Sequence, residues 1–176
     1  ARAAGIALVP QHDLLVEAET VEGNLALFDP AAAPFEGPRA RRARVERLAA
    51  AFGLDLGPPD ARVEDLPVGT RQRIAVAGAL QGNPDVLVLD EPTAVLSPDE
   101  TASLFRALRR RAETGRAVLV ITHRVAEVFE GADRLTLLSR GRTLLESSVS
   151  ATTPGAVAEL LVGGAEVTSR PAPGAR

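Results

Sequence analysis

The sequence predicts an α/β fold built on a parallel sheet, and three observations support this prediction. Two apolar runs, VLVL at 86–89 and AVLVIT at 117–122, have the unbroken hydrophobicity of strands buried on both faces. Between them, SPDE at 97–100 carries the capping signals that open a helix, which we expect over about 98–112. Strand, helix and strand in this order form the βαβ unit from which parallel sheets are made.

The rest of the chain supplies further elements on both sides of this unit. IALV at 6–9 is typical of a short buried strand. Thr20 is a candidate N-cap, and Gly53 and the proline-rich segments at 29–38 and 56–65 mark helix ends and loops. We therefore expect helices over 20–28, 39–52, 67–80, 125–130 and 154–162, a hairpin of 134–139 and 143–147 around the turn 140–142, and a loose tail at 169–176.

Composition narrows the class of protein. The chain has 176 residues, of which 45% are hydrophobic and 24% charged, as in a soluble globular protein. No apolar run approaches the roughly 20 residues that span a bilayer, no signal peptide is evident, and the absence of cysteine excludes disulfides and thiolate metal sites. The net charge is only −3, and the one basic run, RARRARVER at 39–47, is predicted to be a solvated helix face. We therefore expect no nucleic-acid partner.

Two of the residue types that are missing from the chain are informative about its origin. It contains no methionine, and all 20 of its basic residues are arginine, so it contains no lysine. We therefore expect an internal or trimmed segment of a longer protein.

Polar residues that could bind a cation or act on a substrate follow the two central strands. Asp90 and Glu91 stand side by side where the first strand ends, although like charges repel and lose hydration near a core. Thr122 and His123 end the next strand. Because the carboxyl ends of parallel strands meet at one rim, where ligands bind, the sequence predicts a cation or a reacting phosphate there. His123 taken alone would rather be a surface or helix-capping imidazole.

A longer stretch of sequence carries a family resemblance. LPVGTRQRIAVAGALQGNPDVLVLDEPTAVLSPDE at 66–100, followed by VLVITHRVAEVFEGADRLTLLSRGR at 118–142, resembles the nucleotide-binding subunits of ATP-binding cassette (ABC) proteins. The resemblance extends from ALVPQ near the start to LLVGG near the end. It implies the C-terminal part of an ABC ATPase domain, with a parallel-sheet RecA-like core portion and an α-helical subdomain.

The resemblance implies roles for the residues at the strand ends. Gln11 matches the Q-loop glutamine, which contacts Mg²⁺ or the attacking water. Asp90 matches the Walker B aspartate that holds Mg²⁺ through water, Glu91 the general base, and His123 the switch histidine that reaches the γ-phosphate of ATP. An aspartate suits Mg²⁺, a hard cation that takes oxygen ligands and keeps much of its water, and phosphoryl transfer depends chiefly on positioning and charge neutralisation.

The segment that would cover the nucleotide, according to the resemblance, departs from the family pattern. The residues in place of the signature motif, which covers ATP in a partner cassette, are Leu66, Pro67, Val68, Gly69 and Thr70. The family's serine hydroxyl is absent there, whereas a helix N-terminus, which favours anions, remains. Ser97 stands where many members carry the D-loop aspartate, and a capping role is the alternative for it.

The phosphate-binding Walker A loop, G-x-x-x-x-G-K-[ST], is absent from this sequence. In the family it lies upstream of the Q-loop glutamine. We therefore expect this chain alone to bind ATP poorly and to hydrolyse it hardly at all.

The short strings LPVG, EPTAVLSP and LLVG resemble the first cassette of duplicated ATPases that serve simple-sugar and nucleoside importers. The resemblance implies four segments: a core strand at 1–10, a helical subdomain at 11–80, a RecA-like core portion at 81–165 and a loose tail at 166–176. It also implies a second ABC cassette and transmembrane permease subunits as partners, and a cytoplasmic location on the inner face of the plasma membrane.

Two other functions stay open. One is a soluble ABC-type protein that acts on ribosomes or DNA, against which stand the ordinary charge balance and the intact VPQ string at 9–11. The other is a non-catalytic ABC-like regulatory module, which the missing Walker A loop favours. Glu91 and His123, residues that only hydrolysis needs, argue against a regulatory module.

Overall fold

The structure is a computed structural model that describes residues 4–11, 15–29 and 36–163. The chain divides into two compact units, Ala1–Ile121 and Thr122–Arg176. The predicted tail at 169–176 and most of the proline-rich loop at 29–38 lie outside the described residues. The predicted segment boundaries at 10, 80 and 165 stay predictions.

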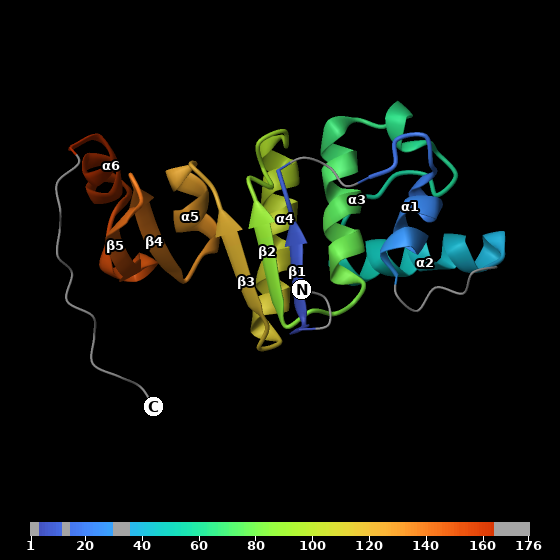
Figure 1. Cartoon of the computed structure of the whole chain (residues 1–176), viewed down its shortest axis with the longest axis horizontal. Coiled ribbons are helices and arrows are strands. Elements are labelled where there is room, and N and C mark those ends of the chain that lie inside the picture. The colour runs from blue at the N-terminus through green and yellow to red at the C-terminus, as the bar shows by residue number, and fades with distance from the viewer. Residues whose placement is uncertain (1–3, 12–14, 30–35, 164–176) are drawn as a thin grey trace. The chain divides into compact units, whose positions relative to one another are not determined.

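A parallel three-stranded sheet forms the centre of the first unit, as predicted (Figure 1). Its strands lie in the order β1 (Ile6–Val9), β2 (Val86–Asp90) and β3 (Ala117–Ile121). Val9 of β1 is the Cα partner of Leu89, and Asp90 is the Cα partner of Ile121. All three carboxyl ends therefore lie at one rim of the sheet.

The described part of the first unit contains four α-helices: α1 (Val21–Phe28), α2 (Pro38–Phe52), α3 (Val68–Leu80) and α4 (Pro98–Glu113). Their ends follow the capping signals of the sequence. Thr20 accepts a hydrogen bond from the Gly23 amide at the start of α1, and Gly53 ends α2 with a φ of 64°, a left-handed conformation that glycine adopts at little cost. Pro67 is the N-cap of α3 rather than part of its first turn.

The core of the first unit lies against one face of the sheet. Ala7, Val9, Leu87 and Leu89, which alternate along β1 and β2, belong to one buried cluster. The same cluster contains apolar residues of α3 and α4, including Ile74 and Leu104 (Figure 1). Both helices therefore cover the same face of the sheet.

The other face of the sheet contradicts the sequence prediction that these strands are buried on both faces. Leu8 is 55% exposed, Leu119 is 54% exposed and Ile121 is 48% exposed. The prediction is wrong for the described part of the chain because the apolar run indicates only that both faces are hydrophobic. Hydrophobicity does not establish that a second layer of helices is present to cover the outer face.

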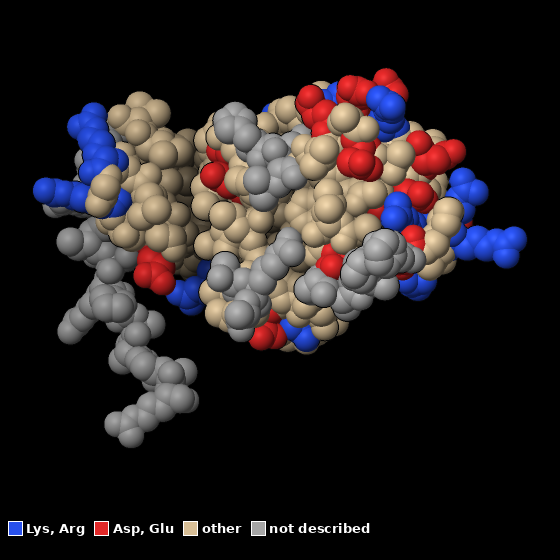
Figure 2. Space-filling model, turned by 45° about the vertical axis from the view of Figure 1, so that its right-hand side comes forward, with Lys and Arg blue, Asp and Glu red and all other residues tan. Residues whose placement is uncertain are grey.

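The basic run at 39–47 is a solvated helix face, as predicted, with one exception. Arg44 is buried, and its guanidinium pairs with Asp29 at 3.2 Å and with Glu36 at 2.5 Å. This arginine therefore ties α2 to both ends of the loop that precedes it. Around it, acidic and basic side chains are interspersed over the helical end of the first unit (Figure 2).

The second unit contains α5 (Val125–Gly131), the antiparallel strands β4 (Arg134–Ser139) and β5 (Arg142–Ser148), and α6 (Pro154–Gly163). The predicted hairpin is confirmed, with Arg140 and Gly141 at φ values of 48° and 75° in its turn. Positive φ at both central residues is typical of a turn that follows the twist of paired strands. Among the described residues, none of the helices has the length and apolar character to cross a membrane.

Candidate functional site

Gln11, Asp90 and Glu91 lie at the carboxyl-end rim of the sheet. Gln11 follows Val9 by two residues, and Glu91 follows Leu89, the Cα partner of Val9, by the same two residues. Parallel strands in this register bring the two chain segments out of the sheet side by side. Gln11 is exposed, and the chain reaches it from the same rim at which the acid pair leaves the sheet.

Glu91 is held in an unusual backbone conformation. Its φ is 48°, in the left-handed region that non-glycine residues seldom occupy. Two hydrogen bonds fix this turn: the Glu91 amide donates to the Ile121 carbonyl at 2.8 Å, and the Glu91 carbonyl accepts from the Ala94 amide at 3.3 Å. Strained conformations of this kind persist where the surroundings over-determine them, and they cluster at active sites. The geometry gives the Glu91 carboxylate a fixed direction of departure from β2.

Asp90 is the last residue of β2 and is partly buried. Within the described part of the chain its carboxylate takes part in no ion pair. That part also contains no group of three or more His, Cys, Asp or Glu side chains that could enclose a metal ion. A single carboxylate at this rim fits Mg²⁺, which keeps several of its waters and takes few protein ligands, better than a cation that needs a full protein cage.

The start of α3 provides the predicted signature segment. The amides of Thr70 and Arg71 donate to the Pro67 carbonyl at 2.9 and 3.1 Å and begin the helix, while Val68 is 52% exposed at its tip. The Thr70 side chain is buried, and its hydroxyl accepts a hydrogen bond from Arg73 at 2.9 Å. What this segment presents outward is therefore the helix N-terminus, whose amide groups favour anions.

Gly69 and Leu66, the other described residues of this segment, pack against neighbouring parts of the first unit. A Cβ added to Gly69 would lie 3.0 and 3.1 Å from the Glu100 carboxylate oxygens and 3.2 Å from Leu96, so this glycine is required for close packing. Leu66 is partly buried beside the same core. Nucleotide contact by Leu66, Pro67, Val68, Gly69 or Thr70 stays a prediction.

Ser97 is the N-cap of α4, which confirms the capping alternative. Its hydroxyl accepts from the Glu100 amide at 3.4 Å, and its own amide donates to the Glu100 carboxylate at 2.9 Å. Both halves of a capping box are therefore present. A direct contact between Ser97 and a nucleotide stays a prediction.

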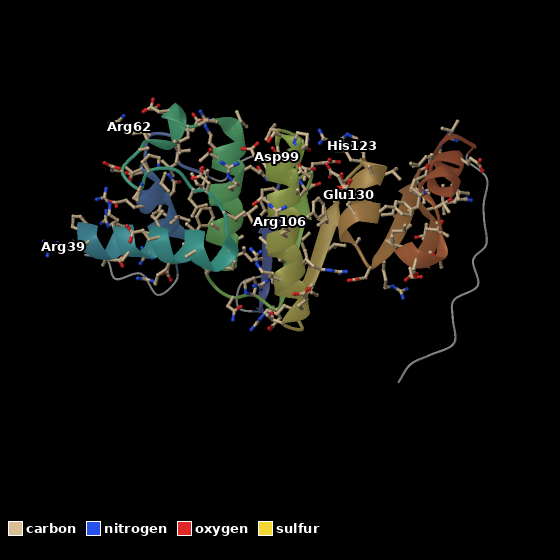
Figure 3. The ribbon with its side chains drawn as sticks, turned by 180° about the vertical axis from the view of Figure 1, so that it is seen from behind. Arg39, Arg62, Asp99, Arg106, His123 and Glu130 are labelled. Atoms are coloured by element: carbon tan, nitrogen blue, oxygen red, sulfur yellow. The ribbon has the colours of Figure 1, made fainter. Side chains whose placement is uncertain are left out.

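His123 belongs to the second unit, two residues after the end of β3, and its side chain is exposed (Figure 3). The residues on either side of it bond to each other, since the Thr122 hydroxyl accepts from the Arg124 amide at 3.0 Å. Arg124 also pairs with the buried Glu127 at 3.1 Å. These contacts fix the backbone around His123. The predicted meeting of His123 with the acid pair stays a prediction.

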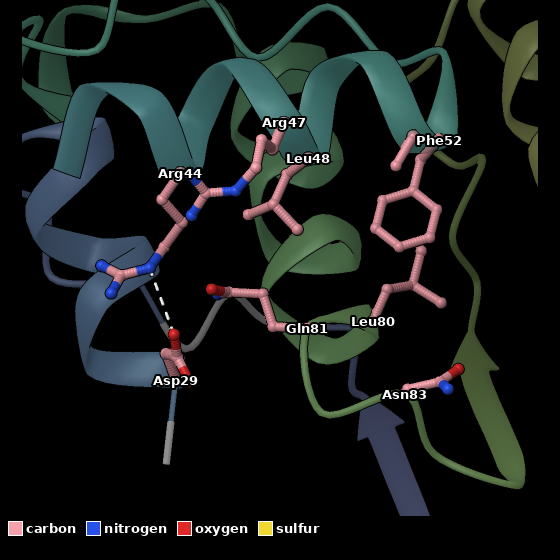
Figure 4. A pocket seen from close by; sticks show the side chains of 9 residues that line it. Asp29, Arg44, Arg47, Leu48, Phe52, Leu80, Gln81 and Asn83 are labelled. Carbon is pink, nitrogen blue, oxygen red and sulfur yellow. Dashed lines mark ion pairs between the residues drawn. The ribbon is translucent and has the colours of Figure 1, made fainter. Parts of the chain in front are cut away.

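A pocket of about 320 Å³ lies elsewhere in the first unit, between α2 and the end of α3. Figure 4 shows the side chains of Leu48, Phe52 and Gln81 around it, with Arg44 reaching across to Asp29. The 13 residues of α3 separate it from the start of that helix by about 18 Å at 1.5 Å per residue. This pocket is therefore distinct from the strand-end rim.

Sequence reasoning missed two features of the site. One is the left-handed conformation of Glu91, for which the sequence gives no signal, because positive φ is expected at glycine or asparagine. The other is the ion pair between Arg73 and Glu100, which joins residues 27 positions apart. By contrast, the pair between Arg124 and Glu127 has the i,i+3 spacing that a sequence search can find.

Comparison with known proteins assigns the chain to a family. A model described as ABC transporter matches residues 1–94, just over half of the chain. The chain belongs to the ABC transporter family. The family match includes Gln11, the signature segment and the acid pair, so the resemblance found in the sequence is confirmed.

Curated relatives of this ABC chain are import proteins. It is 33% identical over 160 residues to the nucleoside import ATP-binding protein NupA of Lactococcus lactis, covering 90% of this chain and 31% of NupA. It is 37% identical over 165 residues to the ribose import ATP-binding protein RbsA 2 of Rhizobium meliloti, covering 93% of this chain and 32% of that protein. The chain thus spans about a third of the length of the curated relatives that it matches.

Solved cassettes share the fold. The chain superposes with a TM-score of 0.71 and 25% identity on a dimeric bacterial ABC transporter cassette, MJ0796, covering 82% of this chain and 62% of that one. A post-hydrolysis dimer of MJ0796 bound to ADP and Pi gives a TM-score of 0.69 at 26% identity. The predicted α/β fold of an ABC ATPase is therefore confirmed.

Proposed function

We propose that the chain is the part of an ABC importer ATPase that carries the metal-binding and water-activating residues, and that the imported solute is a simple sugar or a nucleoside. The observation that carries this proposal is the acid pair at the strand-end rim. Asp90 ends β2 without an ion pair among the described residues, and the next residue is fixed in a left-handed turn. The import proteins for nucleosides and ribose support the solute class.

The rim residues divide the work of phosphoryl transfer. Asp90 and the Gln11 amide would hold the hydrated cation of Mg-ATP. When bound, Mg²⁺ would neutralise charge on the phosphates. Glu91 would orient the attacking water and accept its proton, for which the turn fixed by Ile121 and Ala94 gives it a constant position. His123 would donate a hydrogen bond to the γ-phosphate.

The signature segment would act in trans. We propose a dimer of cassettes in which the start of α3 covers the nucleotide of the opposing cassette, as the dimeric solved cassettes support. Since Thr70 is bonded to Arg73 inside the chain, the segment would use its helix N-terminus rather than a hydroxyl group. The site completed in this way would hydrolyse ATP more slowly than one with the family's serine.

The remaining parts of the proposal concern partners and place. Transmembrane permease subunits would bind the helical part of the first unit, and the assembly would lie at the cytoplasmic face of the plasma membrane. The chain contains no lysine to serve a phosphate-binding loop, and in this proposal that loop would be supplied by residues outside the chain.

The test is ATP hydrolysis and solute uptake in lipid vesicles that contain the longer ATPase carrying this segment together with its permease. We expect Mg²⁺-dependent hydrolysis that rises when ribose or a nucleoside and its binding protein are supplied. Glu91→Gln should lower the rate about 10²- to 10³-fold, the usual worth of a general base, while ATP still binds. Asp99→Asn, an exposed change at the start of α4, is the matched control and should keep the wild-type rate (Figure 3).

Two results would contradict the proposal. Hydrolysis that responds to ribosomes or DNA and ignores the permease would favour a soluble ABC-type protein. ATP binding without measurable turnover in the wild type, and with no effect of Glu91→Gln, would favour the regulatory module.

A further inference from the structure

The start of α3 is joined to the start of α4 by one buried arginine. The Arg73 side chain is 8% exposed, and its guanidinium forms an ion pair with Glu100. The same group donates to the Asp55 carbonyl through Nε at 2.7 Å and to the Thr70 hydroxyl through Nη2 at 2.9 Å. Three partners on three segments hold the guanidinium in one orientation, which uses the planar fork of donors that arginine provides.

Glu100 has a second partner besides Arg73. Its second oxygen accepts from the Ser97 amide in the capping box of α4. That backbone hydrogen bond, together with the hydrogen bond from Arg73, holds the pKa of Glu100 at about 2. The carboxylate therefore stays charged well below the ordinary pKa of a glutamate, and it contacts both helix starts at once.

The first turn of α3 packs closely against the start of α4. The absent Cβ of Gly69 is what allows the Glu100 oxygens and Leu96 to approach the first turn of α3. Leu96 is itself buried in the core cluster. A shift of α3 along its axis must therefore move Glu100 and Leu96, because packed interiors do not compress.

The contact lies next to the acid pair in the chain. Residues 91–97, here the 91–97 loop, connect Glu91 with the cap of α4. The loop is compact: the Leu96 amide donates to the Thr93 carbonyl at 3.1 Å, the Ala94 amide donates to the Glu91 carbonyl at 3.3 Å, and Thr93 is fully buried. These hydrogen bonds give a displacement at Glu100 a short route back to Glu91.

We propose that Arg73 and Glu100 are a positioning pair that couples the start of α3 to the 91–97 loop. This inference rests on the proposed function, in which α3 serves the nucleotide of the opposing cassette and Glu91 serves the nucleotide of its own. The pair then ties the two nucleotide sites of a dimer together through each cassette. Arg73 acts through Glu100 and contacts no nucleotide.

Amide hydrogen exchange by NMR on the full 176-residue chain tests the coupling without nucleotide. In Arg73→Gln, exchange of the Ala94 and Leu96 amides should become about tenfold faster or more, since a hydrogen-bonded charge pair is lost. These amides lie more than 20 positions from the substitution. The buried Val45 amide in α2 should change less than about twofold, because local opening does not spread to distant elements.

Four variants separate coupling from a general loss of structure. Arg71→Gln is the matched control, because Arg71 lies on the same helix but bonds to the Leu66 and Glu64 carbonyls, and it should leave the 91–97 loop unchanged. Arg73→Lys keeps the charge and should restore part of the protection. Glu100→Gln should speed exchange at both Leu96 and Thr70, and adding Arg73→Gln to it should have little further effect.

Two outcomes overturn the proposal: unchanged exchange at Ala94 and Leu96 in both Arg73→Gln and Glu100→Gln, or an equal rise throughout the chain, Val45 included. The result is independent of catalysis. If the vesicle assay finds no hydrolysis while this exchange pattern is observed, the proposed function fails and the coupling stands.

Discussion

Strand β2 has an aspartate at each end, and the two differ in whether the chain supplies a counter-charge. Asp85, just before the strand, pairs with Arg116 at 2.6 Å, and Arg116 also donates to the carbonyls of Asn83 and Pro84. Asp90, at the far end, has no ion pair among the described residues. The amino-end acid is thus neutralised within the chain, whereas the carboxyl-end acid, in our proposal, binds the cation of Mg-ATP.

The amino end of β2 is also reinforced by a buried arginine. Arg111 donates to the Pro84 carbonyl and, at 3.5 Å, to the Asn83 side chain. Burial lowers the pKa of Arg111, and the neighbouring charge of Arg116 lowers it further, while Asp85 opposes both. The comparison teaches that the position of an acid on a parallel strand matters less than whether the fold supplies its counter-charge. Charge that the fold leaves uncompensated at the ligand-binding rim is a sign of function.

The largest expected change in the free energy of unfolding comes from a substitution in the apolar stretch of β2, between its two aspartates. Leu89 is fully buried against α3 and α4. Leu89→Ala should lower the free energy of unfolding by about 2–5 kcal/mol, through lost burial and a residual cavity. Urea denaturation followed by circular dichroism measures this loss.

Leu119→Ala, on the exposed face of the same sheet, is the control and should cost less than about 1 kcal/mol, since its side chain is already half in water. Equal losses for Leu89→Ala and Leu119→Ala would contradict the assignment of one covered and one open face.

A smaller effect is expected at the amino end of the strand. Arg111→Met removes the donors to Pro84 and Asn83 but keeps much of the side-chain volume. It should lower the free energy of unfolding by about 0.5–1.5 kcal/mol, because the Pro84 carbonyl loses one of its two arginine donors and keeps the one from Arg116. Arg106→Met on the exposed side of α4 should stay within about 0.5 kcal/mol of the wild type (Figure 3). A neutral Arg111→Met would mean that the buried arginine does not stabilise the turn before β2.

Acidic pH should weaken the ion pair between Arg73 and Glu100, which follows the carboxyl end of β2 in the chain. The pKa of Glu100 falls from its ordinary 4.5 to about 2 on folding, chiefly through the hydrogen bond from the Ser97 amide and then through Arg73. The folded chain therefore binds this proton less readily than the unfolded chain, so the stabilisation is complete above pH 4.5 and is lost as the pH falls towards 2.

The measurement that checks this is the urea midpoint between pH 5 and pH 2. The decline should be shallower in Glu100→Gln, which has no carboxylate to protonate at this position. An identical decline in the wild type and in Glu100→Gln would show that other carboxylates account for it.

Much of this fold could be predicted from local sequence signals. Thr20, Gly53 and the Ser97 capping box fixed three helix ends in advance, because caps are local chemistry. The parallel order of β2 and β3 followed from the helix between them. The open face of the sheet could not be predicted, since burial depends on which elements cover a strand and not on the strand itself.

Some features of the candidate site could also be predicted from the sequence, and others could not. The acid pair was visible because two carboxylates after an apolar run are unusual in a chain that only has to fold. The inward direction of the Thr70 hydroxyl was not visible, because it depends on Arg73, and the orientation of Arg73 in turn depends on Glu100 and Asp55, which are distant in sequence. Buried arginines such as Arg44 and Arg111 were missed because arginine is usually exposed.

The most direct test of the contrast between the two ends is the Mg²⁺ dependence of ATP hydrolysis in the longer ATPase, compared for Asp90→Asn and Asp85→Asn. Asp90→Asn should raise the Mg²⁺ concentration for half-maximal hydrolysis by about tenfold or more, because a carboxylate that holds the hydrated cation is lost. Asp85→Asn should leave that concentration unchanged and cost less than about 1 kcal/mol of stability, as an exposed pair does. If both variants shift the Mg²⁺ dependence equally, or neither does, the carboxyl-end aspartate is not the metal-binding acid and the account of the rim is wrong.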